Sequence, residues 1–192
     1  MDKELELPSW VYRLQSRLIG QRFAGASLHN ARTTPEDTQR ISDWMKKKTG
    51  FLVMMGKPGC GKTYICSALL SWMYGKVSDM YYFREGKFFE KIRESMDNKG
   101  DWNQEVSYQC DHEFLVFDDI GSAGHGQTGW RQDVFFEIVN LRYQSKNPTV
   151  FSTNYSEQEI KEKLGARTHS RLFSNENTII DMFDYPDLRI SM

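Results

Sequence analysis

The chain has 192 residues, a length that suits one domain with a sizeable hydrophobic core better than two domains. Its 25 lysines and arginines balance 26 aspartates and glutamates, so the formal charge of −1 excludes a general electrostatic affinity for nucleic acid or anionic lipid. Aromatic residues make up 14% of the chain, which argues against disorder. We therefore expect a folded protein whose contacts with nucleic acid, if it makes any, are local.

The chain shows no signal for a membrane or for disulfide bonds. No stretch approaches the ~20 apolar residues that a membrane span needs, and residues 1–8 are acidic where a signal peptide would be basic and then apolar. Cys60, Cys66 and Cys110 form no C-x-x-C pair, so neither a disulfide framework nor a zinc site is predicted. A cytoplasmic protein with reduced cysteines and no membrane contact is expected.

Several segments have the pattern of helices. Residues 10–18 (WVYRLQSRL) predict an amphipathic helix that either packs on the core or docks a partner. A second helix start follows Thr34, with proline in the first turn and acidic residues against the helix dipole. Ser156 and Glu159 form a capping box sequence. Further helices are predicted at residues 63–74, 86–96, 130–144 and 156–164.

Five short runs between the helices predict strands, at residues 51–55, 80–83, 114–117, 149–152 and 178–182. Three of the runs are continuously apolar or aromatic, as expected of parallel strands that are covered on both faces. The alternation of strands and helices predicts an α/β fold in which helices flank a five-stranded parallel sheet.

The first strand is followed directly by a phosphate-binding loop. Residues 56–63 (GKPGCGKT) fit G-x-x-x-x-G-K-[ST] between an apolar strand and a helix pattern. In such a loop the backbone N–H groups point at phosphate, Lys62 reaches the β and γ oxygens, and Thr63 offers its hydroxyl to Mg²⁺. Phosphate binding alone does not distinguish a nucleotide kinase, a GTPase and an ATPase. The predicted nucleotide-binding residues are Gly56, Lys57, Pro58, Gly59, Cys60, Gly61, Lys62, Thr63 and Tyr64.

Two adjacent carboxylates follow the third predicted strand. Asp118 comes directly after the run FLVF, at the edge of a parallel sheet where ATPases hold the metal ion and its water. Asp119 then fits the residue that polarises the attacking water. A strand that merely ends in an acidic turn is the alternative.

Polar side chains also follow the fourth predicted strand, in the run FSTNY. Asn154 is expected to hydrogen-bond the attacking water or the γ-phosphate, with Thr153 behind it. An ordinary turn and helix cap would have the same residue types.

Arginines lie beyond the predicted helix 156–164, in the run GARTHSRL of residues 165–172. An arginine at this edge could enter the site of a neighbouring subunit and neutralise charge on the γ-phosphoryl group. Exposed arginines are common at helix ends, so spacing alone leaves both interpretations open.

The chain resembles the AAA+ ATPases of the DnaC/DnaI helicase-loader and IstB transposition-helper group over roughly residues 22–189. The resemblance is carried by four motifs in order: GKPGCGKT, FDDIG, STNY and LGARTHSRL. The resemblance implies ATP or ADP with Mg²⁺ as cofactors. It implies that Thr63 and Asp118 bind the metal and that Asp119, Asn154 and Arg171 are catalytic. Arg171 would act in trans, with Arg167 as its neighbour at the interface. Arg189 would contact phosphate in cis.

The resemblance also implies a division of the chain. Residues 22–192 would form a P-loop NTPase core of the AAA+ type whose helical lid is reduced or absent. Residues 1–21 would form an N-terminal extension with a candidate partner-docking helix. Asp119 stands where AAA+ motors usually carry glutamate, so a slower, switch-like use of nucleotide is expected.

Residues 84–96 resemble the helical element that lines a single-strand channel in such loaders. Basic residues there alternate with Phe88 and Phe89, a combination suited to single-stranded DNA. With Ile92 the two phenylalanines also have the spacing of a helix face that packs on the core, so both interpretations stay open. The basic residues are Lys87, Lys91 and Arg93.

The expected function is that of an ATP-dependent helicase loader in the cytoplasm of a bacterium or a phage-infected bacterium. Such a protein would self-associate through Arg171, assemble on a replicative hexameric DNA helicase and bind single-stranded DNA weakly as a monomer. Three alternatives remain: an IstB-like transposition helper, a small-molecule P-loop kinase and, because of Asp119, an adaptor that binds ATP without hydrolysing it.

Overall fold

One parallel sheet organises the molecule. The computed structural model describes residues 8–97, 101–121 and 129–190. Its five strands are all parallel and lie in the order β2-β3-β4-β1-β5. The α/β fold with a five-stranded parallel sheet is confirmed. The strands are β1 (Phe51–Met55), β2 (Met80–Arg84), β3 (Phe114–Ile120), β4 (Thr149–Thr153) and β5 (Thr178–Asp181).

Helices fill the connections between the strands. The predicted caps are present, since the Thr34 hydroxyl accepts the N–H of Asp37 at 3.1 Å and Ser156 opens α7 with a capping box. No helix in the described ranges is long and apolar enough to cross a bilayer. The helices are α1 (Ser9–Leu18), the 3-10 turn η1 (Gln21–Phe23), α2 (Pro35–Lys47), α3 (Lys62–Met73), α4 (Glu85–Asp97), α5 (Trp102–Cys110), α6 (Gly129–Ser145), α7 (Glu157–Leu164) and α8 (Ala166–Leu172).

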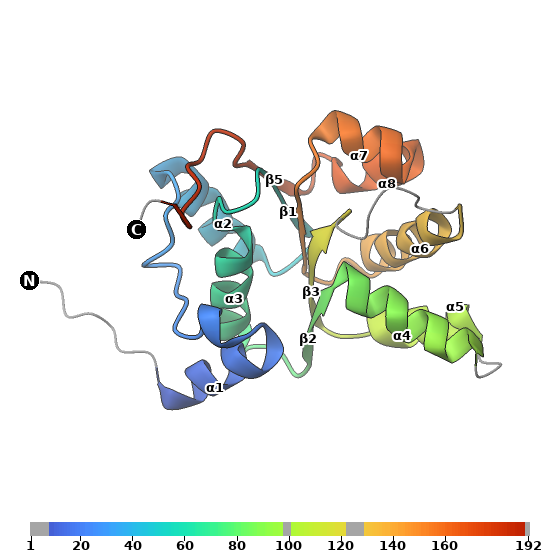
Figure 1. Cartoon of the computed structure of the whole chain (residues 1–192), viewed down its shortest axis with the longest axis horizontal. Coiled ribbons are helices and arrows are strands. Elements are labelled where there is room, and N and C mark those ends of the chain that lie inside the picture. Colours follow the sequence, from blue (N-terminus) through green and yellow to red (C-terminus); the bar gives the residue numbers. More distant parts are fainter. Residues whose placement is uncertain (1–7, 98–100, 122–128, 191–192) are drawn as a thin grey trace, which may run out of the picture.

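The helices form two layers with the sheet between them (Figure 1). α1, α2 and α3 lie on one side, and α4 to α8 lie on the other. Each side has its own core, one around Trp44 and Leu69 and the other around Phe117 and Phe135. Burial on both faces accounts for the continuously apolar runs of β1 and β3.

The helix predicted at residues 10–18 packs on the core. Gln15 of α1 is fully buried, and its side-chain amide donates to the carbonyl oxygens of Ala26 at 2.7 Å and of Ser67, in α3, at 3.3 Å. Trp10 and Tyr12 of α1 remain partly exposed, at 37% and 45%. Packing of this helix is therefore observed, whereas its docking to a partner stays a prediction.

Candidate nucleotide-binding and catalytic site

Most of the predicted site residues line one cavity of about 550 Å³ at the carboxyl ends of the strands. Parallel strands expose their carboxyl ends at one edge of a sheet, which is where α/β proteins bind nucleotides. A segment that the sequence did not indicate, residues 22–32, contributes Arg22, Phe23 and Arg32 to the wall. The predicted residues that line the cavity are Pro58, Gly59, Gly61, Lys62, Thr63, Tyr64, Asp118, Asp119, Asn154 and Arg189.

The phosphate loop has the backbone that its glycines permit. Gly59 and Gly61 adopt φ of +89° and +106°, a region that side chains disfavour. A Cβ atom on Gly59 would lie 2.0 Å from Oδ1 of Asp187, so a side chain there would displace the Asp187 carboxylate. α3 starts at Lys62, and the N–H groups of a first helical turn have no partner within the helix. The loop and helix start therefore fit a phosphate group.

Lys62 is 93% buried, with its ammonium group at the junction of the loop and β4. The ammonium donates to the carbonyl oxygens of Gly56 at 2.6 Å and Lys57 at 2.9 Å, and to Oδ1 of Asn154 at 2.9 Å. These contacts hold a positive charge beside the cavity, where phosphate oxygens would bind.

Asp118 is almost fully buried and receives hydrogen bonds from several directions. Thr63 donates to its Oδ2 at 3.0 Å and the Tyr82 hydroxyl donates to the same atom at 2.8 Å. The Ser152 hydroxyl and the Cys66 thiol donate to Oδ1. Oxygen groups of a hydroxyl and a carboxylate are what Mg²⁺ prefers. Thr63 and Asp118 thus fit the expected metal site.

Tyr82 and Cys66 stay neutral beside this carboxylate. Burial, reinforced by the negative charge of Asp118, raises the pKa of the Tyr82 hydroxyl and of the Cys66 thiol. Arg84 donates through Nε to the Tyr82 oxygen at 3.2 Å, and this bond raises the pKa of Arg84. Tyr82, Cys66, Arg84 and Ser152 were not predicted as site residues, although the parallel pairing of Arg84 with Asp118 follows from a sheet in which β2 and β3 are neighbours.

Asn154 connects Lys62 to Asp119. Its Nδ2 donates to Oδ1 of Asp119 at 3.0 Å, while its Oδ1 accepts from Lys62. Asp119 itself has φ of +64°. The structure therefore brings together the lysine, the amide and the second carboxylate that were predicted separately.

Arg171 and Arg167 lie on α8, outside the described lining of the cavity. Their guanidinium carbons lie 4.7 and 4.3 Å from the ring centre of Phe136 in α6. Nε of Arg171 also donates to Oδ1 of Asn140 at 3.1 Å. The two arginines are thus held in one cluster on the surface of α6.

Arg189 lies at the cavity in an ion pair with Asp187. Its Nε and NH2 donate to the two carboxylate oxygens at 2.9 and 2.6 Å. These hydrogen bonds lower the pKa of Asp187 to about 2. Phosphate contact by Arg189 stays a prediction. Residues 182–190 follow β5 without a helix.

Of the two interpretations of Phe88 and Phe89, core packing is the one observed. These side chains are 1% and 3% exposed, and Ile92 is fully buried with them. The ring of Phe88 packs on Phe117 of β3 at 5.1 Å, because burying large aromatic surface in the core outweighs leaving it in water. The basic residues of α4 point outward, and Lys87 forms an ion pair with a neighbouring glutamate.

The fold and the site define a P-loop NTPase of the AAA+ type. The defining features are the sheet order, the phosphate loop after β1, the carboxylates at the end of β3 and the amide after β4. Residues 30–171 match the family described as IstB-like ATP binding protein. The chain belongs to this family, since the match covers most of its length.

Named relatives are similar at low identity. The replicative helicase loader DnaI of Bacillus subtilis is 26% identical over 158 residues, which cover 77% of this chain and 50% of that protein. The replicative helicase loader DnaC of Escherichia coli K12 is 23% identical over 121 residues, which cover 62% and 49%. A solved structure of the DnaC helicase loader aligns with a TM-score of 0.71 and 20% identity, covering 84% of this chain and 99% of that one. The chain spans about half the length of the curated relatives it matches.

Proposed function

We propose that this protein is an ATP-dependent helicase loader. It binds ATP or ADP with Mg²⁺, assembles with further copies of itself on a replicative hexameric DNA helicase, and assists the placing of that helicase on single-stranded DNA. The observation that carries the proposal is the convergence of Lys62, Asp118, Asp119 and Asn154 on one cavity. Family membership and the names of the relatives support it.

Each side chain has a role that its position supports. Lys62 and the N–H groups at the start of α3 bind phosphate oxygens. Thr63 and Asp118 hold the metal ion, which supplies charge neutralisation at the phosphates when bound. Asp119, oriented by Asn154, accepts the proton of the attacking water.

Arg171 acts on the site of a neighbouring subunit in this proposal. It lies outside the described lining of its own cavity and is oriented by Phe136 and Asn140. An arginine supplied in trans stabilises charge on the transferred phosphoryl group.

A mixing experiment tests the catalytic part of the proposal. Lys62→Ala and Arg171→Ala proteins are each expected to lose ATP hydrolysis. Their mixture is expected to regain part of it, because Arg171 of the Lys62→Ala protein then meets the intact phosphate loop of the Arg171→Ala protein. Failure of the mixture to regain activity, with both variants folded, would place Arg171 outside a shared site.

Co-purification tests the partner. The wild-type protein is expected to bind the replicative helicase of its host and to increase helicase loading on single-stranded DNA in the presence of ATP. A transposition helper of the IstB type is the second candidate, since the family description names IstB. ATP-dependent preference for duplex over single-stranded DNA would favour that candidate.

A further inference from the structure

The backbone around Asp119 departs from the regular sheet. β3 and β4 pair from Phe117 with Phe151 to Ile120 with Thr153, so β3 carries one extra residue at this point. Asp119 occupies the bulge and takes the left-handed φ of +64°. Because that conformation is disfavoured for a residue with a side chain, the surroundings have to maintain it.

Side chains of β4 and of Tyr155, which lies two residues after β4, replace the missing backbone pairing. The N–H of Asp119 donates to Oγ of Ser152 at 3.0 Å. The hydroxyl of Thr153 donates to the carbonyl oxygen of Ile120 at 2.8 Å. The hydroxyl of Tyr155 donates to the carbonyl oxygen of Gly121, also at 2.8 Å. Three consecutive residues after Asp118 are thus each fixed by one side chain of the neighbouring segment.

Tyr155 contacts the last of these three residues, Gly121, directly after the end of β3. A Cβ atom on Gly121 would lie 2.0 Å from the Tyr155 ring, so the ring lies directly against the bare backbone of a glycine with φ of +87°. The N–H of Tyr155 donates to the hydroxyl of Thr153 at 3.0 Å, which links two members of the set.

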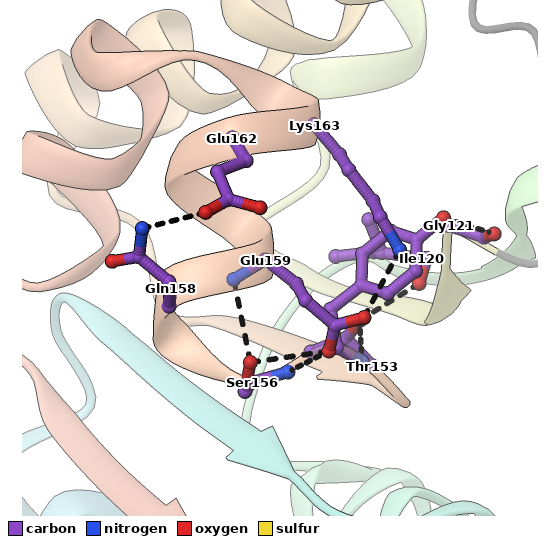
Figure 2. Close-up of polar contacts among 9 residues, drawn as sticks. Ile120, Gly121, Thr153, Ser156, Gln158, Glu159, Glu162 and Lys163 are labelled. Atoms are coloured by element: carbon purple, nitrogen blue, oxygen red, sulfur yellow. Dashed lines mark hydrogen bonds and ion pairs between the residues drawn. The ribbon is translucent and has the colours of Figure 1, made fainter.

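α7 supplies a further contact to the Tyr155 ring. The ammonium group of Lys163 lies 4.1 Å from the ring centre and forms an ion pair of 3.0 Å with Glu159. Glu159 in turn accepts the N–H of Ser156 and completes the cap of α7. Figure 2 shows Lys163 beside Ile120 and Gly121 at the end of β3, with Glu159 and Ser156 next to it.

We propose that Tyr155 is a positioning residue for the carboxylate of Asp119. Its hydroxyl and ring hold the backbone of Gly121, and thereby the bulge, so that the Asp119 carboxylate stays beside Asn154 and faces the cavity. Tyr155 is not among the described residues that line the cavity, so it acts through Asp119. The inference rests on the proposed role of Asp119 in ATP hydrolysis.

Tyr155→Phe tests the inference, because it removes the hydroxyl and keeps the ring. In the nucleotide-free protein, amide hydrogen exchange of residues 119–121 is expected to rise about fivefold, the effect of one lost hydrogen bond, with exchange in α3 unchanged. In steady-state hydrolysis kcat is expected to fall about fivefold, with KM and the dissociation constant for ATP unchanged. Thr153→Val, which removes the bond to Ile120 at nearly constant volume, is expected to give the same pattern.

Tyr185→Phe is the matched control, since it loses a phenol hydrogen bond of 2.6 Å to Asp37 and is expected to change neither measurement. Wild-type exchange at residues 119–121 in Tyr155→Phe would overturn the inference. So would faster exchange with an unchanged kcat in an active protein. If the wild-type protein hydrolyses no ATP, the proposed function fails, and the exchange measurement alone then decides whether Tyr155 holds the bulge.

Discussion

The hydroxyl of Tyr82 donates a hydrogen bond of 2.8 Å to Oδ2 of Asp118, the same oxygen atom that accepts a hydrogen bond of 3.0 Å from Thr63. Tyr82 belongs to β2, an edge strand that continues into α4. The candidate metal site is therefore supported from the outer edge of the sheet as well as from the phosphate loop. Partners behind a ligand fix its orientation and tune its affinity for metal.

Tyr82→Phe is expected to weaken Mg²⁺ binding in the presence of ATP by about tenfold, because Asp118 loses a donor that orients it. Titration of ATP hydrolysis with Mg²⁺, at saturating ATP, measures the effect. Tyr81→Phe, on the same strand with a 37% exposed side chain, is the control and is expected to keep the wild-type Mg²⁺ requirement. Equal Mg²⁺ curves for Tyr82→Phe and wild type would contradict the prediction.

Phe136→Leu is expected to lower ATP hydrolysis in the assembled protein about fivefold, because two cation–π contacts that orient Arg171 and Arg167 are lost. ATP binding by the unassembled chain should stay unchanged. When the variant is mixed with Lys62→Ala protein, which supplies an intact Arg171 to the variant's intact phosphate loop, part of the lost activity is expected to return. Phe173→Leu, whose ring stacks on His169, is the control. Full activity of Phe136→Leu alone, or no gain on mixing, would show that Phe136 does not act through Arg171.

Alkaline pH is expected to destabilise the protein through its buried thiols. Burial raises the pKa of Cys110 to about 12. Above the ordinary thiol pKa of about 8.5 the unfolded chain releases this proton while the native state keeps it, so stability falls between about pH 8.5 and 10. Cys110→Ala is expected to reduce that fall by about 1 to 2 kcal/mol. Urea unfolding at pH 7.5 and pH 10 measures it, and identical pH dependence in both proteins would contradict the expectation.

Arg142→Met is expected to destabilise the fold by roughly 3 kcal/mol, because buried acceptors lose their donors. Arg142 is fully buried, and burial lowers its pKa to about 10. Urea unfolding gives the free-energy difference, and the half-exposed Arg40→Met serves as control. A loss below about 1 kcal/mol would mean that water replaces the guanidinium. The acceptors are the carbonyl oxygens of Cys110, His112 and Pro148 and the hydroxyl of Thr149.

Strands and the phosphate loop were predictable because their signals are local. The apolar run of residues 51–55 coincides with β1, and each of the other four predicted strands overlaps an observed one. α5 and α8 were missed. α5 mixes polar residues with few apolar ones and buries only Val106, Gln109 and Cys110, so its sequence carries little periodicity.

The interactions between segments could not be predicted in the same way. Asp119 was predicted for its place after an apolar run, but its bulge depends on Ser152, Thr153 and Tyr155 in another strand. Phe88 and Phe89 were compatible with either DNA contact or core packing from the sequence alone. They are buried in the core because α4 packs against β3.

The cavity wall combines residues 22–32 with Leu188 and Arg189, and the N–H of Leu188 donates to the carbonyl oxygen of Gly59 at 3.0 Å. During synthesis the phosphate loop leaves the ribosome long before residue 188 does. A nascent chain therefore cannot complete this cavity until β5 and the segment after it have emerged. Nucleotide that contacts this wall can therefore stabilise the chain only after residue 189 has been made.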